Sequence, residues 1–290
     1  MKKKILITGT SGQIGNLFLN DALKKGFIVT DILRKKNLKN KNLILLRKKF
    51  KYNYKSIFFS KVHQLDKKLQ NLNFDIFINF ATKYKNKHEN KDIPKFIESN
   101  IIFPSVILDK IHGKIKKFIN IGTMMQHVDG KSYSPKNFYA STKSAFEILQ
   151  NFYLLGKKLK IYNLKFYESF TENDKRKKLI PILIRNFRKN KTSKIISKKL
   201  ELNIIHVNDI FKAIYIIFNK DLQSGSYCLK QRKNINIYNF IKQTNKKIKK
   251  KIKVKFLNQK VYKISSNKLN IIPNWRADNK INIKIQKQFI

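Results

Sequence analysis

The stretch that decides the fold is Lys4-Ile5-Leu6-Ile7-Thr8-Gly9-Thr10-Ser11-Gly12-Gln13-Ile14-Gly15. An apolar run that stops at closely spaced glycines predicts a buried strand, a tight turn and a helix over residues 14–25, which Gly26 ends. These glycines let the backbone turn sharply and let a pyrophosphate approach with no Cβ in its way. Free amides at the helix start favour phosphate binding. We therefore expect Gly9, Gly12, Gln13, Ile14 and Gly15 to bind a dinucleotide.

Strands and helices alternate along the chain after this turn. Strands are predicted over residues 27–33, 75–81, 117–122 and 159–166, and helices over residues 93–111, interrupted near Pro104, and 139–155. Such alternation is typical of an α/β protein whose parallel sheet is covered on both faces. We expect a Rossmann-type, doubly wound parallel sheet in residues 1–166 and a smaller α/β substrate lobe in residues 167–290.

The composition argues against several other classes of protein. The 290 residues are 42% hydrophobic, which suffices for a substantial core. The single cysteine, Cys228, cannot form an internal disulfide, and the five His residues have no metal-ligand spacing, so no metal site is expected. The apolar run after Lys4 is too short for a signal peptide, and no stretch approaches the ~18 apolar residues that cross a membrane. We expect a cytoplasmic protein.

The net charge of +48 suggests a polyanionic partner such as nucleic acid. Of the 65 basic residues, however, 58 are Lys, and they are spread over nearly the whole chain. Proteins that read nucleic-acid sequence rely on the guanidinium forks of Arg. Lys, Asn and Ile are all abundant and share A/T-rich codons, so coding bias explains the charge better than a nucleic-acid site does.

Tyr139 and Lys143 are the pair that points to catalysis. A four-residue offset on a helix puts the phenol and the ammonium on one face, where the cation favours the phenolate and lowers a pKa that is normally ~10. Such a tyrosine can act as a general acid or base. Two other Tyr/Lys pairs share this spacing, but only Tyr139 follows the fifth strand and its closing hydroxyl residue, Thr123. The Thr123 hydroxyl is predicted to bind the reacting oxygen.

With these motifs the chain resembles the extended short-chain dehydrogenase/reductase superfamily, and within it the NAD-dependent epimerase/dehydratase family that modifies nucleotide sugars. The resemblance covers residues 4 to 230 and rests on the glycine turn, residues 75–81, residues 98–100, the Thr123/Tyr139/Lys143 set and residues 206–209. It implies that Tyr139 transfers a proton and that Thr123 orients the sugar oxygen. It implies that Lys143 tunes the tyrosine and holds the nicotinamide ribose, that Ala81 and Asn100 contact the cofactor, and that the protein is a homodimer.

Two departures from the family pattern and one further resemblance narrow the expected activity. Met124-Met125 follow Thr123 where dehydratases of the family carry Asp-Glu, and Met cannot transfer protons, so dehydration is not expected. Residues 170–172 replace the Tyr-Gly-Pro that is common in the family, so the family's substrate contacts are not carried over. Basic residues beyond them either bind a substrate diphosphate or are solvated: Lys175, Arg176, Arg185 and Arg188. Residues 120–126 with Tyr133-Ser134-Pro135 resemble reductases of CDP-linked 4-keto-deoxy sugars.

The expected activity is therefore reduction of a 4-keto nucleotide sugar in cell-surface polysaccharide biosynthesis, with Tyr139 as the proton donor. A nucleotide-sugar 4-epimerase is the nearest alternative, since it oxidises and re-reduces the same carbon. An alternative of another class is a non-catalytic NAD(P)- or RNA-binding protein on the same fold.

The end of the second strand decides between NAD and NADP. An acidic residue there accepts hydrogen bonds from the adenosine ribose, whereas a basic residue accommodates a 2′-phosphate. Asp31 lies in the middle of the strand, and Arg34 follows its end. We expect an NAD(P) cofactor, with NADP(H) favoured and Arg34 at the 2′-phosphate.

Overall fold

The structure is a computed structural model that describes residues 2–128, 134–156, 158–261 and 269–290. Tyr133, part of the segment that resembles the CDP-sugar reductases, lies outside these residues. In the described chain seven parallel strands form one sheet in the order β11-β6-β5-β4-β1-β2-β3. The strands are β1 (Lys4–Thr8), β2 (Ile28–Arg34), β3 (Tyr54–Phe59), β4 (Ile76–Asn79), β5 (Lys117–Ile121), β6 (Lys160–Phe166) and β11 (Gly225–Leu229). The predicted Rossmann-type fold class is confirmed.

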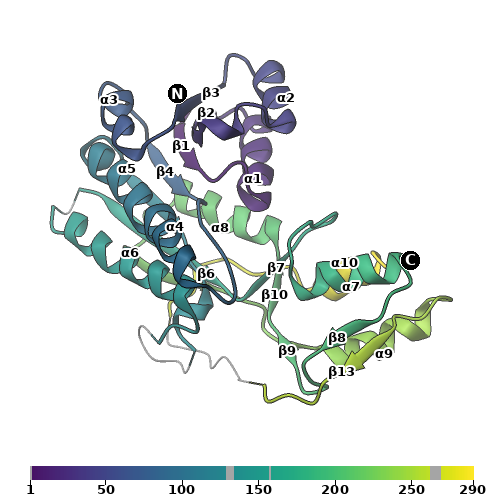
Figure 1. Ribbon diagram of the computed structural model, residues 1–290. Helices are drawn as coiled ribbons and strands as arrows, with labels where there is room; N and C mark the ends of the chain where they lie inside the picture. The colour runs from purple at the N-terminus through teal and green to yellow at the C-terminus, as the bar shows by residue number, and fades with distance from the viewer. Residues whose placement is uncertain (1, 129–133, 157, 262–268) are drawn as a thin grey trace.

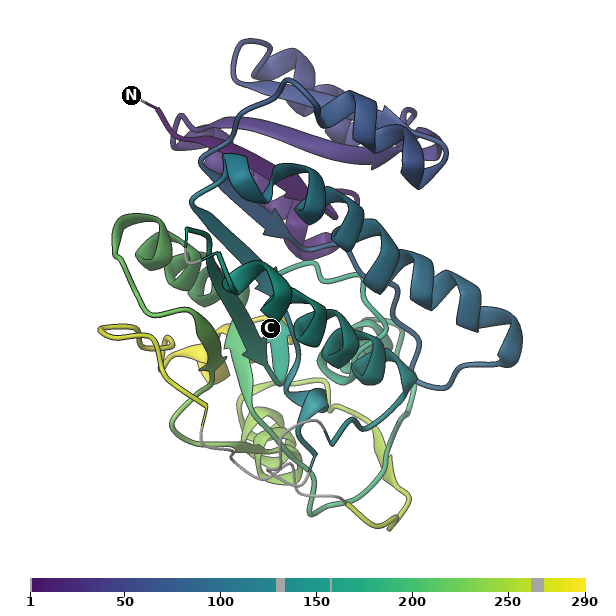
Figure 2. The ribbon, with the colours of Figure 1, turned by 90° about the vertical axis from the view of Figure 1, so that its left-hand side faces the viewer.

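Two layers of helices cover the sheet because successive strand residues face opposite sides. Ile5 and Ile7 share a core with α1 and α8, whereas Leu6 shares a core with α3, α5 and α6. Figure 1 shows the two layers, and Figure 2 looks onto the layer that contains α5 and α6. The helices around the sheet are α1 (Gln13–Lys24), α2 (Lys41–Lys49), α3 (Leu65–Leu69), α4 (Ile93–Ile97), α5 (Phe103–Ile111), α6 (Phe138–Leu154) and α8 (Val207–Asn219).

A smaller lobe with its own apolar core follows β6. Phe170, Leu183, Phe240 and Ile285 belong to this core. Figure 1 shows α7, α9 and α10 gathered beside the sheet, with the C-terminus among them. The lobe contains β7 (Glu168–Phe170), α7 (Leu179–Arg188), β8 (Ser193–Ile195), β9 (Glu201–Leu202), β10 (Ile204–His206), β12 (Ile235–Asn236), α9 (Ile237–Lys247), β13 (Val254–Phe256) and α10 (Ile281–Gln286).

Residues beyond 166 also contribute to the sheet and its core. Strand β11 pairs with β6, and α8 packs on the same core as α1. The division at residue 166 stays a prediction, and the topology adds that residues 207–229 return to the sheet.

The helix predicted over residues 93–111 is interrupted near Pro104, as expected, by a change of helix type rather than by a break in the chain direction. A π-helical turn, Glu98–Ile102, joins α4 to α5, and the proline lies in the first turn of α5. Because proline has no N–H, it cannot donate the hydrogen bond that would close an ordinary α-turn, and the wider turn before it absorbs this defect.

A ladder of buried polar side chains crosses four strands on the face that α6 covers. The Thr8 hydroxyl donates to Asn79 Oδ1 (2.6 Å), and the amide of each strand then donates to the next: Asn79 to Asn120 (3.0 Å) and Asn120 to Asn163 (2.8 Å). Asn163 donates to Gln150 Oε1 on α6 (2.9 Å). This amide ladder joins β1, β4, β5 and β6 to the helix that carries Tyr139.

Candidate active site

The glycine turn has no room for side chains. Gly9 has φ +79°, and a Cβ there would lie 2.5 Å from the backbone of Phe80 and Ala81. A Cβ on Gly15 would lie 2.4 Å from the carbonyl oxygen of Gly9. Gly12 donates its N–H to that same oxygen (3.0 Å), and α1 begins directly after it, at Gln13. The turn is therefore a tight cradle at a helix N-terminus, which suits a pyrophosphate.

A cleft of about 1230 Å³ starts at this turn and runs past the carboxyl ends of the strands. Its lining includes nine of the predicted site residues: Gly9, Gly12, Gln13, Ile14, Gly15, Arg34, Ala81, Thr123 and Tyr139. Lys143 and Asn100 lie behind the wall, each 1% exposed. The cleft extends to Glu168 and Lys178, where the smaller lobe begins.

Burial moves the pKa values of Tyr139 and Lys143 apart. It raises the pKa of Tyr139 to about 12, with Tyr84 and Glu168 adding to the rise and the Thr82 hydroxyl opposing it. Burial lowers the pKa of Lys143 to about 8, although the Glu147 carboxylate opposes the change. The expectation that Lys143 lowers the Tyr139 pKa is wrong for this structure, because burial raises this pKa and Lys143 is not among the groups that shift it. Tyr139 is thus a protonated phenol at neutral pH.

The side chain of Lys143 takes part in no hydrogen bond or ion pair within the described parts of the chain, although it is almost wholly buried. A buried ammonium without a partner is costly. Together with the tight glycine turn, it fits a protein that receives a polar cofactor in this cleft.

Thr123 caps the short turn Met124–Gln126 at the end of β5. Its hydroxyl oxygen accepts from Met125 N (3.2 Å), and its own N–H donates to Gln126 Oε1 (3.0 Å). A hydroxyl that accepts one hydrogen bond still has its proton to donate. Thr123 and Tyr139 therefore bring two O–H donors to the same cleft.

Asn100 stabilises the cleft wall through three hydrogen bonds. Its amide accepts from Lys83 N (2.7 Å), donates to Lys83 O (3.1 Å) and donates to Thr142 Oγ1 (2.9 Å). These bonds tie the loop after β4 to α6. The structure places Ala81 and Arg34 on the cleft and Asn100 in its support, and direct contact of Asn100 with the cofactor stays a prediction.

The acidic and basic residues of β2 occupy different places. Asp31 Oδ2 accepts from Thr10 Oγ1 and Tyr54 Oη, both at 2.6 Å, and burial raises the Asp31 pKa. Asp31 therefore supports the glycine turn from below. Arg34 lies on the cleft, paired with Glu98 at 2.9 Å and stacked 5.5 Å from the Phe59 ring centre.

Three residues of the cleft were missed by the sequence reasoning: Tyr84, Glu168 and Lys178. Tyr84 packs its ring against Tyr139, and Glu168 forms an ion pair with Lys178 at 2.6 Å. Glu168 is the nearest acidic residue after β6, and its position directly beyond that strand is the signal that could have found it. In a chain so rich in Lys, nothing sets Lys178 apart.

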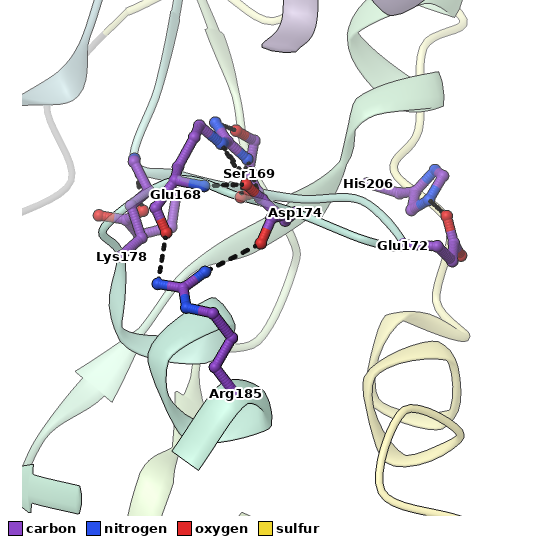
Figure 3. Close-up of polar contacts among 8 residues, drawn as sticks. Glu168, Ser169, Glu172, Asp174, Lys178, Arg185 and His206 are labelled. Carbon is purple, nitrogen blue, oxygen red and sulfur yellow. Dashed lines mark hydrogen bonds and ion pairs between the residues drawn. The ribbon is translucent and has the colours of Figure 1, made fainter. Parts of the chain in front are cut away.

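Of the four basic residues expected near a substrate diphosphate, Arg176 and Arg185 hold their own loop together, whereas Lys175 and Arg188 are exposed (Figure 3). Arg176 lines the cleft but pairs with Asp174 (2.5 Å) and donates to Ser169 Oγ (2.9 Å). Arg185 donates to the carbonyl oxygen of Asp174 (3.1 Å), as the dashed line in Figure 3 shows. His206 pairs with Glu172 at 3.1 Å and caps α8. Arg176, Arg185 and His206 therefore serve the structure of this loop.

The fold and the cleft define a dinucleotide-binding α/β protein with a Tyr/Lys pair on α6, the helix beside the cleft. The sequence profile of the "NAD dependent epimerase/dehydratase family" matches residues 5–229. The chain belongs to this family, as the motifs predicted, and is an enzyme of an NAD-dependent class.

Two curated relatives, both named CDP-abequose synthase, match most of the chain. The protein of Yersinia pseudotuberculosis is 29% identical over 248 residues, which are 84% of this chain and 82% of the relative. The protein of Salmonella muenchen is 22% identical over 230 residues, which are 78% and 74% of the two chains.

Solved structures share the fold over nearly the whole length. UDP-glucuronic acid 4-epimerase from Bacillus cereus, in complex with UDP-4-deoxy-4-fluoro-glucuronic acid and NAD, has a TM-score of 0.81 at 18% identity, covering 99% of this chain and 98% of its own. UDP-N-acetylglucosamine 4-epimerase from Methanobrevibacter ruminantium, in complex with UDP-N-acetylmuramic acid, has a TM-score of 0.78 at 18% identity, covering 100% and 98%. At these identities the likeness concerns the fold.

In residues 2–128, 134–156, 158–261 and 269–290, no group of three or more His, Cys, Asp or Glu side chains is placed to hold a metal ion. Across the same ranges, every helix is too short or too polar to span a membrane.

Proposed function

We propose that this chain reduces the 4-keto group of a nucleotide sugar with NAD(P)H, for the synthesis of a cell-surface polysaccharide. The observation that carries the proposal is that Tyr139 and Thr123 both line one cleft that begins at the glycine turn. Two relatives named CDP-abequose synthase support a CDP-linked substrate.

The residues present fit a dinucleotide. The turn from Gly9 to Gly15 would hold the pyrophosphate, Arg34 would contact a 2′-phosphate, and Lys143 would meet the nicotinamide ribose. NAD(P)H, when bound, supplies the hydride that the carbonyl carbon accepts. The preference for NADP(H) rests on Arg34 at the cleft and on Asp31, whose carboxylate is engaged beneath the turn.

Tyr139 then supplies the proton. Reduction of a ketone leaves a negative charge on oxygen, and a phenol whose pKa is raised to about 12 is protonated at neutral pH and ready to donate. The proton passes from Tyr139 Oη to the new alcohol oxygen, and the phenolate regains a proton from solvent. Thr123 donates a second hydrogen bond to the same oxygen.

A 4-epimerase is the second candidate, because the solved structures that share the fold include 4-epimerases. Epimerisation begins with oxidation, in which the tyrosine must first accept a proton.

The experiment follows NADPH absorbance with CDP-, dTDP- and UDP-linked 4-keto sugars as substrates. We expect Tyr139→Phe to abolish turnover and to leave NADPH binding unchanged. Tyr153→Phe is the matched control, since Tyr153 lies on the same helix but bonds to Asp109 at the surface. Retained activity in Tyr139→Phe would refute the proposal, and protein purified with tightly held NAD would favour the epimerase.

The homodimer implied by the family belongs to the same proposal. The outer face of α6 exposes a row of apolar side chains: Ile148, Leu149, Phe152 and Leu155. A second copy of the chain would cover this face, and Phe152→Lys should then convert the dimer to a monomer in light scattering. A monomeric parent protein would contradict this part. The cytoplasmic location also stays a prediction.

A further inference from the structure

Glu147 lies one helical turn beyond Lys143 on α6 and is held in a buried polar cluster. Its carboxylate accepts from Lys165 Nζ (2.7 Å) on β6, from Gln126 Nε2 (2.7 Å) and from the Ser226 hydroxyl on β11. The carboxylate of Glu147 is thus bound from three separate elements. We name Gln126, Glu147, Lys165 and Ser226 the Glu147 cluster.

The cluster reaches the candidate active site through Gln126. This side chain is 1% exposed, and its Nε2 donates to Glu147 while its Oε1 accepts from Thr123 N. A carboxylate can only accept from the amide nitrogen, so Glu147 fixes which way the Gln126 amide faces. That orientation presents the amide oxygen to the Thr123 N–H.

The packing leaves little freedom around this connection. A Cβ on Gly122 would lie 2.9 Å from Lys165 Cγ and 3.0 Å from Gln126 Oε1. The end of β5 is therefore pressed directly against the Glu147 cluster. Thr123, the next residue, is held by its own N–H on one side and by the Met125 N–H on its hydroxyl oxygen on the other.

We propose that Glu147 and Gln126 are positioning residues, which set the direction of the Thr123 hydroxyl toward the reacting oxygen. The proposal rests on the role of Thr123 in the proposed function. Its physical basis is that a donor held in place before the reaction needs no reorganisation during it. Tyr139, Lys143 and Glu147 thereby occupy three successive turns of α6, and Glu147 couples that helix to the Thr123 loop.

The first test replaces Gln126 by Leu, which has a similar shape and no amide. We expect kcat for the CDP-linked 4-keto sugar to fall roughly tenfold to a hundredfold, with the KM for NADPH changed by less than about twofold. Glu147→Leu/Lys165→Met should behave alike, because Leu offers Gln126 Nε2 no acceptor and removing both charges avoids an unpaired buried ammonium.

The matched control is Gln150→Leu. Gln150 is also a buried amide of α6, but it bonds to Asn163 in the amide ladder rather than to the Thr123 loop. We expect this variant to lose stability and to keep the parent kcat. An equal fall of kcat in Gln150→Leu would show a general packing effect and overturn the proposal.

A double-mutant cycle tests whether Gln126 acts through Thr123. In a Thr123→Val background, Gln126→Leu should have no further effect on kcat. The same fold-loss in both backgrounds would overturn the proposal. Hydrogen exchange of the Thr123 amide gives a readout without turnover: it should accelerate in Gln126→Leu and stay unchanged in Gln150→Leu, and unchanged exchange in both variants would overturn the proposal as well.

The outcomes separate this proposal from the proposed function. If Gln126→Leu keeps the parent kcat while Tyr139→Phe and Thr123→Val lose activity, the positioning role alone is overturned. Full activity in Tyr139→Phe and Thr123→Val would overturn both.

Discussion

The ring of Tyr84 stands edge-on to the ring of Tyr139, with centroids 4.9 Å apart and planes at 87°. Tyr84 comes from the loop after β4 and Tyr139 from the first turn of α6, so the contact joins two walls of the cleft. An edge-to-face contact fixes a ring in rotation as well as in position. Tyr84 therefore holds the orientation of the phenol that we propose as the proton donor.

Tyr84→Ala should lower kcat roughly tenfold, because the Tyr139 ring loses its neighbour and samples unproductive orientations. Tyr84→Phe keeps the ring contact and should stay within about threefold of the parent. Steady-state kinetics with NADPH and a CDP-linked 4-keto sugar measure both. Equal losses in the two variants would instead assign the effect to the Tyr84 hydroxyl.

Lys143→Met should stabilise the protein near neutral pH while abolishing turnover. Burial lowers the pKa of Lys143 to about 8, so its charged form is disfavoured by folding. The shift corresponds to a stability cost on the order of 1–3 kcal/mol below that pKa. Such a gain on removal of a catalytic group is typical of a functional site.

The pH dependence of this effect has a definite sign. Between about pH 8 and ~10.4 the unfolded chain holds the Lys143 proton and the folded protein does not, so the parent gains stability as pH rises. The Tm advantage of Lys143→Met should therefore shrink across this window in calorimetry. An advantage that stays constant from neutral pH upward contradicts the lowered pKa.

Arg34→Asp should raise the KM for NADPH by roughly tenfold or more and leave the KM for NADH within about threefold, since only NADPH carries the 2′-phosphate. The Arg34 guanidinium already lies on the cleft, held by Glu98 and the Phe59 ring. If Arg34→Asp left the KM for NADPH unchanged, the assignment of Arg34 to the 2′-phosphate would be wrong. Arg47→Asp serves as a control, because Arg47 stacks on Phe58 and bonds to Ser56 outside the cleft lining.

Gly15→Ala should weaken NADPH binding at least roughly tenfold, because a methyl group 2.4 Å from the Gly9 carbonyl oxygen forces the turn to move. Gly113→Ala is the matched control, since nothing lies within 4 Å of the position a Cβ would take. Isothermal titration calorimetry with NADPH compares the two variants. Parent affinity in Gly15→Ala would mean that the turn tolerates the displacement.

Much of the fold follows from local sequence pattern. Strands β1, β2, β4, β5 and β6 are apolar runs bounded by glycine or polar residues, and α1 and α6 bury one face of a regular repeat. The segment from Arg34 to Leu72 could not be assigned, because α2 buries only Leu43 and its Lys-rich surface hides the helical period. The pairing of β11 with β6 joins segments about 60 residues apart, which no local pattern reveals.

Part of the candidate site could likewise be predicted from the sequence, and part of it could not. The glycine turn, Thr123, Tyr139 and Lys143 are marked by spacing and by their place after strands. The pKa of Tyr139 could not be predicted, because it depends on burial by the loop that carries Tyr84. The support given by Asn100 and Asp31 was also not predictable, since a polar residue looks the same in sequence whether it faces a ligand or a neighbouring loop.

The amide ladder bears on how the chain finds its native strand order. Strands β1, β4, β5 and β6 are all short and largely apolar, so hydrophobicity alone would let them exchange places in the sheet. Each carries one member of the ladder, Thr8, Asn79, Asn120 or Asn163, whose partner lies on the next of these strands. An arrangement that separates these four strands or shifts their register would bury an amide without a partner, at about 1–3 kcal/mol for each. Misassembled sheets are therefore penalised most at the edge where the cleft forms.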